Sequence, residues 1–213
     1  MKRALILIAF AATLFAAEKA QAQLNIHAGY SPELMTAQTP THDTTCFYHG
    51  ICFGLNWTFD LSDHLSLTAG AQYRMNLRDA SEHYGIILPF ITHDLIRERQ
   101  TLVDLPILLK YDIPVGSQVT LKPFAGPMLC WGIQGKTTEI VTWPHSAEVH
   151  YDWYGDDGYI NRFNMYAMAG LEMSYKRFTF SVGSRYGFLD LNKRNTGTTI
   201  KTYGFFASFG HTF

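Results

Sequence analysis

The sequence predicts an all-β fold, an eight-stranded antiparallel up-and-down transmembrane β-barrel. Three observations support this prediction. Apolar residues recur at every second position in eight stretches, the connections between the stretches alternate between long and short, and aromatic residues gather at both ends of the stretches. A period of two indicates a strand, and alternating connection lengths with two aromatic belts are typical of barrels that span an outer membrane.

The first 22 residues are predicted to be a cleaved secretory signal. Two basic residues follow the initiating methionine, an apolar run comes next, and Ala20 and Ala22 supply the small residues that signal peptidase recognises. The apolar run is shorter than the roughly 20 residues of a membrane-spanning helix; an uncleaved anchor is the alternative. We therefore expect a signal peptide at 1–22, an outer-membrane β-barrel at 23–213, and localisation in the outer membrane after export.

The composition narrows the possible classes of protein. Basic and acidic residues are nearly balanced, 17 against 18, so the charge does not favour nucleic acid as a partner. Three cysteines are too few for a disulfide-stapled scaffold. Because no later apolar stretch is long enough for a spanning helix, membrane insertion would require a closed barrel. We expect no cofactor.

Eight stretches carry the strand pattern, and their apolar faces hold no Asp, Glu, Lys or Arg. They are Leu24–Tyr30, Ile51–Asp60, Leu65–Met75, Val103–Asp112, Leu121–Gln134, Arg162–Tyr175, Phe178–Phe188 and the terminal Lys201–Phe213. A soluble β-sandwich would alternate in the same way, because its apolar faces point at a core. In a membrane barrel the absence of charges from the apolar faces has a separate explanation, since a lipid-facing basic side chain at the middle of the bilayer costs about 2–4 kcal/mol.

Connection lengths favour the barrel over the sandwich. The long connections are Ser31–Gly50, Asn76–Leu102 and Gly135–Asn161, the short ones are Leu61–His64, Ile113–Thr120 and Lys176–Arg177, and Leu189–Ile200 is intermediate. Short turns on one side and long loops on the other are expected of an up-and-down barrel threaded through a membrane. A Greek-key sandwich has no reason to produce that alternation.

The polar faces of the strands predict a charged barrel interior. We expect nine inward charges, five basic and four acidic: Asp60, Arg74, Asp104, Lys110, Asp112, Lys122, Arg162, Glu172 and Arg185. Eight strands enclose a space that side chains can just fill. Near-balance of sign favours mutual neutralisation, which buried charges need. We therefore expect a plug of ion pairs, with an open channel as the alternative.

The third long connection gathers aromatic residues beside carboxylates. Trp143, Tyr151, Trp153 and Tyr154 are candidates for stacking on a sugar or gripping a protein partner, because exposed aromatics are favoured at binding surfaces. The alternative is an outer loop that folds over the barrel mouth or lies on the lipopolysaccharide surface. The histidines of the outer loops show no zinc-motif spacing, so we expect them to be solvated and predict no metal site.

The three cysteines leave two interpretations open. Cys46 and Cys52 lie six positions apart near the first loop, and an oxidising exterior would allow a disulfide between them. Cys52 and Cys130 both fall on inward faces, where they would serve as small interior side chains.

Strands four to eight resemble the Bacteroidetes-type outer-membrane β-barrel domain family, a porin-like group of eight-stranded, OmpX-like barrels that includes PorT. The stretches that carry the resemblance are Leu105–Tyr111, Lys122–Pro127, Ala169–Met173 with Phe178–Ser181, Arg185–Gly187 and Phe209–Phe213. The resemblance implies an outer-membrane location and a barrel that is empty or filled by side chains; it does not imply an enzyme. Pro106, Pro123 and Pro127 look like family features, and each removes a hydrogen-bond donor, so we expect local irregularity there.

These observations predict a monomeric, non-enzymatic outer-membrane protein that lies in outer-membrane lipid. Its long loops would meet an extracellular ligand or an envelope protein, or its barrel would support secretion or envelope assembly. A narrow pore for small solutes is the first alternative. A lipid-modifying enzyme is the second, and it would need a Ser–His–carboxylate constellation at the outer rim.

The terminal aromatic, Phe213, is by resemblance the kind of signal that the barrel-assembly machinery recognises. We expect Phe213→Asp to lower the amount of assembled protein in the outer membrane more than the loop substitution His145→Ala does. Quantitative blotting of fractionated membranes measures both amounts. Equal levels of the two variants would contradict the assembly role of Phe213.

Overall fold

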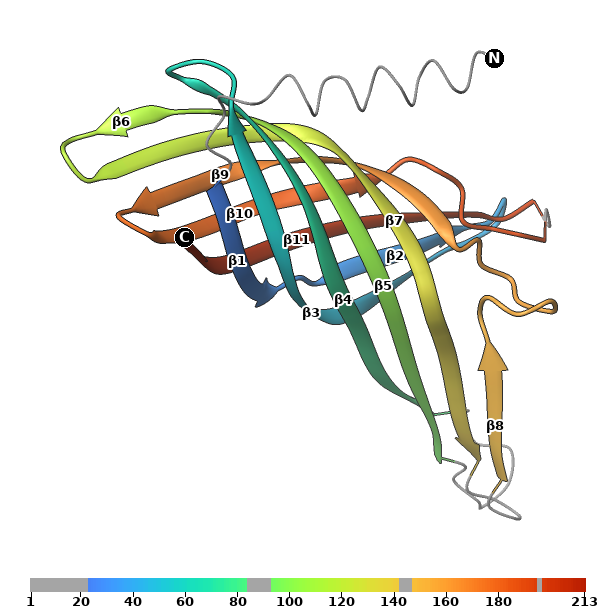
Figure 1. The fold of residues 1–213 in the computed structure, drawn as a ribbon. Helices are drawn as coiled ribbons and strands as arrows, with labels where there is room; N and C mark the ends of the chain where they lie inside the picture. The colour runs from blue at the N-terminus through green and yellow to red at the C-terminus, as the bar shows by residue number, and fades with distance from the viewer. Residues whose placement is uncertain (1–22, 84–92, 142–146, 195–196) are drawn as a thin grey trace.

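The computed structural model describes residues 23–83, 93–141, 147–194 and 197–213 (Figure 1). The predicted signal peptide, 1–22, and the candidate binding residue Trp143 lie outside the described residues. No helix in the described part is long and apolar enough to cross a membrane. The strands are β1 Gln23–Tyr30, β2 Glu33–Gln38, β3 Asp43–Asp60, β4 Leu65–His83, β5 His93–Tyr111, β6 Ile113–Val115, β7 Val119–Val141, β8 Ala147–Asp152, β9 Phe163–Tyr175, β10 Phe178–Gly187 and β11 Thr199–Thr212.

Eight of these strands close into an antiparallel ring. The order is β1, β11, β10, β9, β7, β5, β4 and β3, and β3 pairs back with β1. Gln23 pairs with Thr58 and Asn25 with Thr212. The start of β1 and the end of β11 therefore both lie at the short-turn end of the barrel. Closure leaves the ring without an open edge. The predicted fold class, an all-β, eight-stranded antiparallel up-and-down barrel, is confirmed.

The face assignment of the strands is also confirmed. Outward residues such as Phe53 and Phe209 are more than half exposed, whereas inward Met128 and Phe206 are buried. A contiguous exposed apolar belt on a closed barrel is stable when lipid covers it, because water would penalise that surface. The inside-out distribution therefore makes this a membrane-spanning barrel.

The first strand differs from the prediction, which ended it at Tyr30 and began a long loop at Ser31. The barrel strand continues as β2, which pairs with β3 and β11 on the same two sides as β1 does. Only residues 39–42 connect β2 to β3. The interruption lies at Ser31-Pro32, where proline lacks the N–H that ladder pairing needs. The expected long loop Ser31–Gly50 is therefore wrong.

Three neighbouring strands are also longer than predicted. β4 and β5 stay paired as far as His83 and His93, and β7 continues to Val141 with β8 on its other side. Figure 1 shows these strands projecting beyond the rest of the barrel at the long-loop end. We call this four-stranded projection the extension: residues 77–83, 93–99, 134–141 and 147–152. Polar residues occur on both of its faces, so it lacks the apolar alternation by which the other strands are recognised.

The expected irregularity at the prolines is confirmed. The β4–β5 ladder keeps its register, but its pairing is interrupted beside Pro106, and the pairing of β5 with β7 is interrupted in the same way beside Pro127. A register shift follows between Thr101 and Leu102, where β7 carries one extra residue. A bulge of this kind increases local twist at a barrel rim, and it marks the point where the extension begins.

Candidate functional site: the barrel interior and its outer cap

Four buried charged residues occupy the middle of the lumen; we call them the central network. They are Glu33 on β2, Arg74 on β4, Asp104 on β5 and Arg185 on β10. Arg74 Nε lies 2.8 Å from Asp104 Oδ2, and Arg74 also pairs with Glu33. Arg185 Nη2 lies 3.0 Å from the same Glu33 oxygen. All four side chains are at most 2% exposed, so each charge depends on its partners for solvation.

Neutral groups complete the hydrogen bonding of the central network. Tyr166 donates its hydroxyl to Glu33 at 3.3 Å, and its ring lies 5.7 Å from the Arg74 guanidinium. Gln72 donates to Asp104 at 3.2 Å. Arg185 donates to the Ser31 hydroxyl at 2.5 Å. Buried ions are stable when their remaining lone pairs and protons are satisfied in this way, and the middle of the lumen is consequently filled.

Small inward glycines make room for the large side chains of the interior. A Cβ at Gly204 would lie 2.7 Å from Arg185 Nε, and one at Gly183 would lie 2.5 Å from the Phe206 ring. Both contacts are closer than a real Cβ tolerates. The inward glycines are therefore part of how an eight-stranded barrel accommodates its filling.

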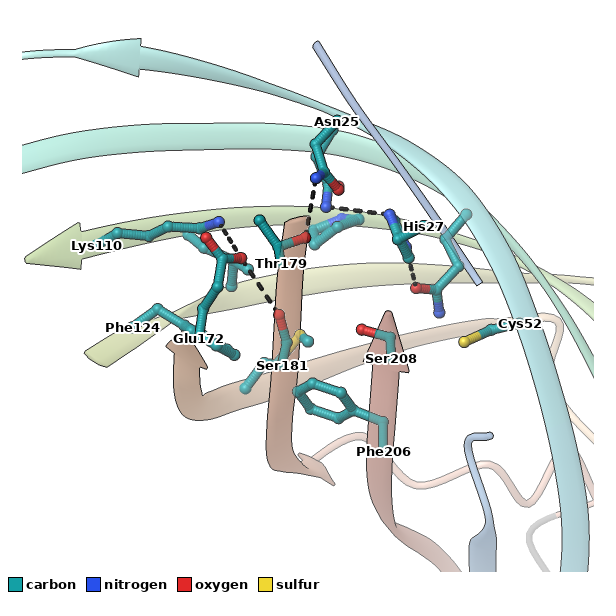
Figure 2. A pocket seen from close by; sticks show the side chains of 15 residues that line it. Asn25, His27, Cys52, Lys110, Phe124, Glu172, Thr179, Ser181, Phe206 and Ser208 are labelled. Atoms are coloured by element: carbon teal, nitrogen blue, oxygen red, sulfur yellow. Dashed lines mark hydrogen bonds and ion pairs between the residues drawn. The ribbon is translucent and has the colours of Figure 1, made fainter. Parts of the chain in front are cut away.

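Two further ion pairs lie between the central network and the short-turn end. Lys110 Nζ lies 2.8 Å from Glu172, which also accepts the Ser181 hydroxyl at 3.2 Å, and Lys122 lies 2.9 Å from Asp112. Figure 2 shows Lys110, Glu172 and Ser181 together on one side of a small cavity. The cavity volume is about 40 Å³, enough for a water molecule or two but not for an organic solute.

His27 lies on the opposite wall of this cavity (Figure 2). Its Nε2 lies 3.2 Å from Gln72 Oε1, and its Nδ1 lies 3.3 Å from Asn56 Nδ2. Both neighbours are amides, so neither supplies the carboxylate that would orient a histidine base. A wider hollow of about 170 Å³ lies at the short-turn end, lined in part by Lys110, Lys122 and Glu172.

The structure brings most of the predicted interior charges together. Seven of the nine form ion pairs: Arg74, Asp104, Lys110, Asp112, Lys122, Glu172 and Arg185. Asp60 is exposed at the short-turn end, beside the Asp112–Lys122 pair. Arg162 is exposed at the opposite rim, where it donates to the carbonyls of Gly132 and Tyr154, each at 3.2 Å. Neither of these two lies in the filled interior.

Glu33 is the interior residue that sequence reasoning missed. Glu33 fell into a predicted loop because the first strand was expected to end at Tyr30. The alternation of buried residues nevertheless continues through Ser31, Glu33 and Met35. With Glu33 included and both Asp60 and Arg162 excluded, the ion pairs of the described lumen below the rim contain four basic and four acidic residues. The interior is balanced in charge.

A separate apolar cluster, which we call the outer cap, closes the long-loop end. Its buried members are Met35, Tyr48, Trp153, Tyr154, Ile160, Leu191 and Ile200. Trp153 has no exposed surface and donates its indole N–H to Thr137 at 2.7 Å. The Tyr154 hydroxyl accepts from Gln100 at 2.8 Å, and a Cβ at Gly132 would lie 2.3 Å from its ring.

The outer cap contains two of the four candidate binding aromatics. Trp153 and Tyr154 point into the cap, because burying these rings over the mouth removes a large apolar surface from water. Burial raises the pKa of the Tyr154 and Tyr159 hydroxyls above their usual range, so both stay neutral. Of the candidate binding residues in the described chain, only Tyr151 is exposed, at 50%.

The cysteines and histidines form no metal or disulfide site in the described residues. Cys46 and Cys52 lie six residues apart on β3, roughly 20 Å in an extended strand, which excludes the disulfide considered between them. Cys52 and Cys130 are buried inside the barrel, as expected of small interior side chains. The Cys130 sulfur lies 3.6 Å from Arg74 Nη2.

Removing one member of the central network should destabilise the barrel strongly. We expect Glu33→Gln to lower the free energy of unfolding by about 3–5 kcal/mol, because two buried guanidinium groups lose a shared carboxylate. The control, Asp60→Asn, changes an exposed carboxylate and should stay within about 0.5 kcal/mol. Urea unfolding in lipid vesicles measures both, and equal midpoints would contradict the role assigned to Glu33.

The outer cap should depend on Trp153 and not on Tyr151. Trp153→Ala removes a fully buried ring, at a cost of about 3–5 kcal/mol, so local opening should rise by a hundredfold or more. Limited proteolysis of the outer loops in intact vesicles should accelerate accordingly, whereas Tyr151→Ala should leave the rate close to that of the wild type. If both variants were cleaved at the wild-type rate, the cap would not be held by its core.

Comparisons with known proteins agree with the barrel architecture and go no further. No family model and no curated protein matches the chain. Ail, the attachment invasion locus protein of Yersinia pestis, aligns at 12% identity with a TM-score of 0.44, over 90% of this chain and 99% of that one. The translocator domain of the autotransporter NalP from Neisseria meningitidis aligns at 12% identity with a TM-score of 0.46, over 95% of this chain and 92% of that one. The outer membrane enzyme PagL aligns at 13% identity with a TM-score of 0.37, over 84% of this chain and 97% of that one. These likenesses concern the fold alone.

Proposed function

We propose that this chain is a non-enzymatic integral protein of the outer membrane, closed in the middle of its barrel, whose ordered outer end meets an extracellular ligand or an envelope protein. The observation that carries the proposal is the central network. Arg74 and Asp104, from adjacent strands, have no exposed surface, and Glu33 joins them to Arg185 across the lumen.

The central network argues against solute passage. A permeating ion would have to separate charges that are bonded at 2.8–3.0 Å and are solvated only by one another. Separating a buried pair costs several kcal/mol, because each freed charge is left without compensation. The 170 Å³ hollow at the short-turn end is best explained as a vestibule that reaches the Lys110–Glu172 pair, below the central network.

The hydrogen bonds of the histidines argue against an enzyme. Among the histidines whose side chains the structure describes, none bonds to a serine: His27 contacts amides, His49 contacts Tyr30, and His150 contacts Thr138. Only His150 has a carboxylate nearby, Glu148 at 3.8 Å, and both side chains are about 60% exposed. An open, hydrated arrangement lacks the water-excluded environment in which transition-state charge is stabilised.

The outer end has the properties of a preformed contact surface. The outer cap fixes the loop between β8 and β9, so little additional ordering is needed on binding. β8 presents Tyr151 and Val149, which are 50% and 38% exposed. Among the described strands β8 pairs with β7 alone, which leaves its second edge available to an incoming strand.

Biogenesis and membership of a particular family are part of the same proposal. The resemblance of strands four to eight to the Bacteroidetes-type porin-like barrels favours a supporting role in envelope assembly or secretion. The chain would act as a monomer in outer-membrane lipid, without nucleic acid as a partner, and the barrel-assembly machinery would recognise Phe213. Phe213 is 69% exposed and adjoins β1 through a hydrogen bond from its N–H to the Leu24 carbonyl, 2.9 Å long.

Electrical recording tests the closed lumen. We expect the purified protein in planar bilayers to give no reproducible single-channel steps, because the central network blocks the path. Heat-modifiable gel mobility of the same sample verifies that the barrel is folded. Reproducible steps would overturn the plugged barrel in favour of a narrow pore. Release of labelled acyl chains from lipid in detergent would favour the lipid-modifying enzyme instead.

A further inference from the structure

Two cations face each other on the outward surface of the extension. Arg99 on β5 and Lys136 on β7 are direct partners in the antiparallel register, and both are exposed. Like charges directly opposite each other on one face of a sheet repel and destabilise the pair. The arrangement therefore has a cost within the isolated protein.

Among the residues that the structure describes, no ion pair offsets this repulsion. Neither Arg99 nor Lys136 has an ion pair within 4 Å, although nearby cations do: Arg97 lies 3.3 Å from Asp79 on the same face. Asp152 is the register partner of Lys136 on β8, but its carboxylate accepts the Tyr154 backbone N–H at 2.9 Å. Within the described residues, neither cation of the pair therefore forms an ion pair.

The position of the pair relative to the membrane points to the missing anion. Four residues further along β5 the same outward face reaches Val103, whose partner Trp131 is 51% exposed and packs beside Phe163 in the aromatic belt. Four residues of strand span roughly 13 Å, less when tilted, and long basic side chains reach several ångströms toward the interface. Aromatic belts lie at headgroup level, so the two cations lie at or just above the lipid phosphates.

We propose that Arg99 and Lys136 bind the phosphate of an anionic lipid in the leaflet at the long-loop end. The guanidinium offers a bidentate fork and the ammonium a compact charge, which together suit one phosphate group. Asp79 is the register partner of Arg97, and Asp152 is the register partner of Lys136. These two carboxylates lie on either side of the cation pair and disfavour binding of an extended polyanion. This inference rests on the proposed membrane-spanning orientation and adds a specific lipid contact to it.

Titration with a phosphorylated lipid tests the proposal. Full-length protein in neutral nanodiscs is titrated with dansyl-labelled lipid A bearing phosphate, and energy transfer from tryptophan reports binding. We expect the double variant Arg99→Gln/Lys136→Gln to bind about thirtyfold more weakly, since each basic residue near an anionic lipid surface contributes about fivefold. The control, Lys176→Gln/Arg177→Gln, removes the same charge from the short-turn end and should bind like the wild type.

The outcomes separate the possible sources of the phosphate. Equal affinity of the wild type and the double variant would overturn the site, and so would equal binding of dephosphorylated lipid A. Displacement of the labelled lipid by millimolar inorganic phosphate would assign the site to free phosphate rather than to a lipid. Each sample is first checked for heat-modifiable mobility. Channel steps would contradict the plugged barrel without changing this binding result, so failure of one proposal is distinguishable from failure of the other.

Discussion

The ion pairs of Arg74 with Glu33 and Asp104 are the interaction on which the rest of the barrel depends. They join three strands, β2, β4 and β5, and Arg185 adds β10 from the far side of the lumen. Each of these charges is buried, so a displacement of any one strand would expose the network to the full cost of an uncompensated ion. The requirement that all four meet at one point constrains strand register, the break at Ser31-Pro32 and the small residues that leave room for the guanidinium groups.

The molecule has two interiors that differ in chemistry. Inside the membrane-spanning barrel the centre is ionic, and small apolar clusters that include Met128 and Phe206 lie beside the charges. Beyond the rim, water is the solvent, and there an ordinary apolar cluster forms around Trp153 and Tyr48. The bulge near Thr101 lies at the boundary between the membrane-spanning barrel and the part of the protein that water surrounds. The outer cap and the central network thus lie at two levels of the barrel and are held together by different forces.

The extension places distinct surfaces at the outer boundary of the membrane. One face continues into the outer cap, where Glu98 accepts the Tyr48 hydroxyl at 2.7 Å and pairs with Arg78. The opposite face carries Arg99 and Lys136 above the aromatic belt. A lipid contact on one face would hold the outer end at a fixed distance from the membrane. The exposed edge strand β8 would then be presented to a partner in a fixed position. Rigid placement of this kind lowers the ordering cost of an encounter.

The sequence by itself determined the strand pattern, the eight-stranded barrel and the direction of nearly every side chain within the span, because lipid demands an apolar outer face and a two-residue period records it. It also identified seven of the charges that pair inside. Only the tertiary structure decided which charge meets which, since partners such as Arg185 and Glu33 lie 152 positions apart. The sequence could not show that Glu33 points inward beyond Pro32, that Trp153 is buried, or that β4, β5 and β7 continue past the membrane. Outside the lipid both faces of a strand can be polar, so the period that reveals the barrel vanishes where the extension begins.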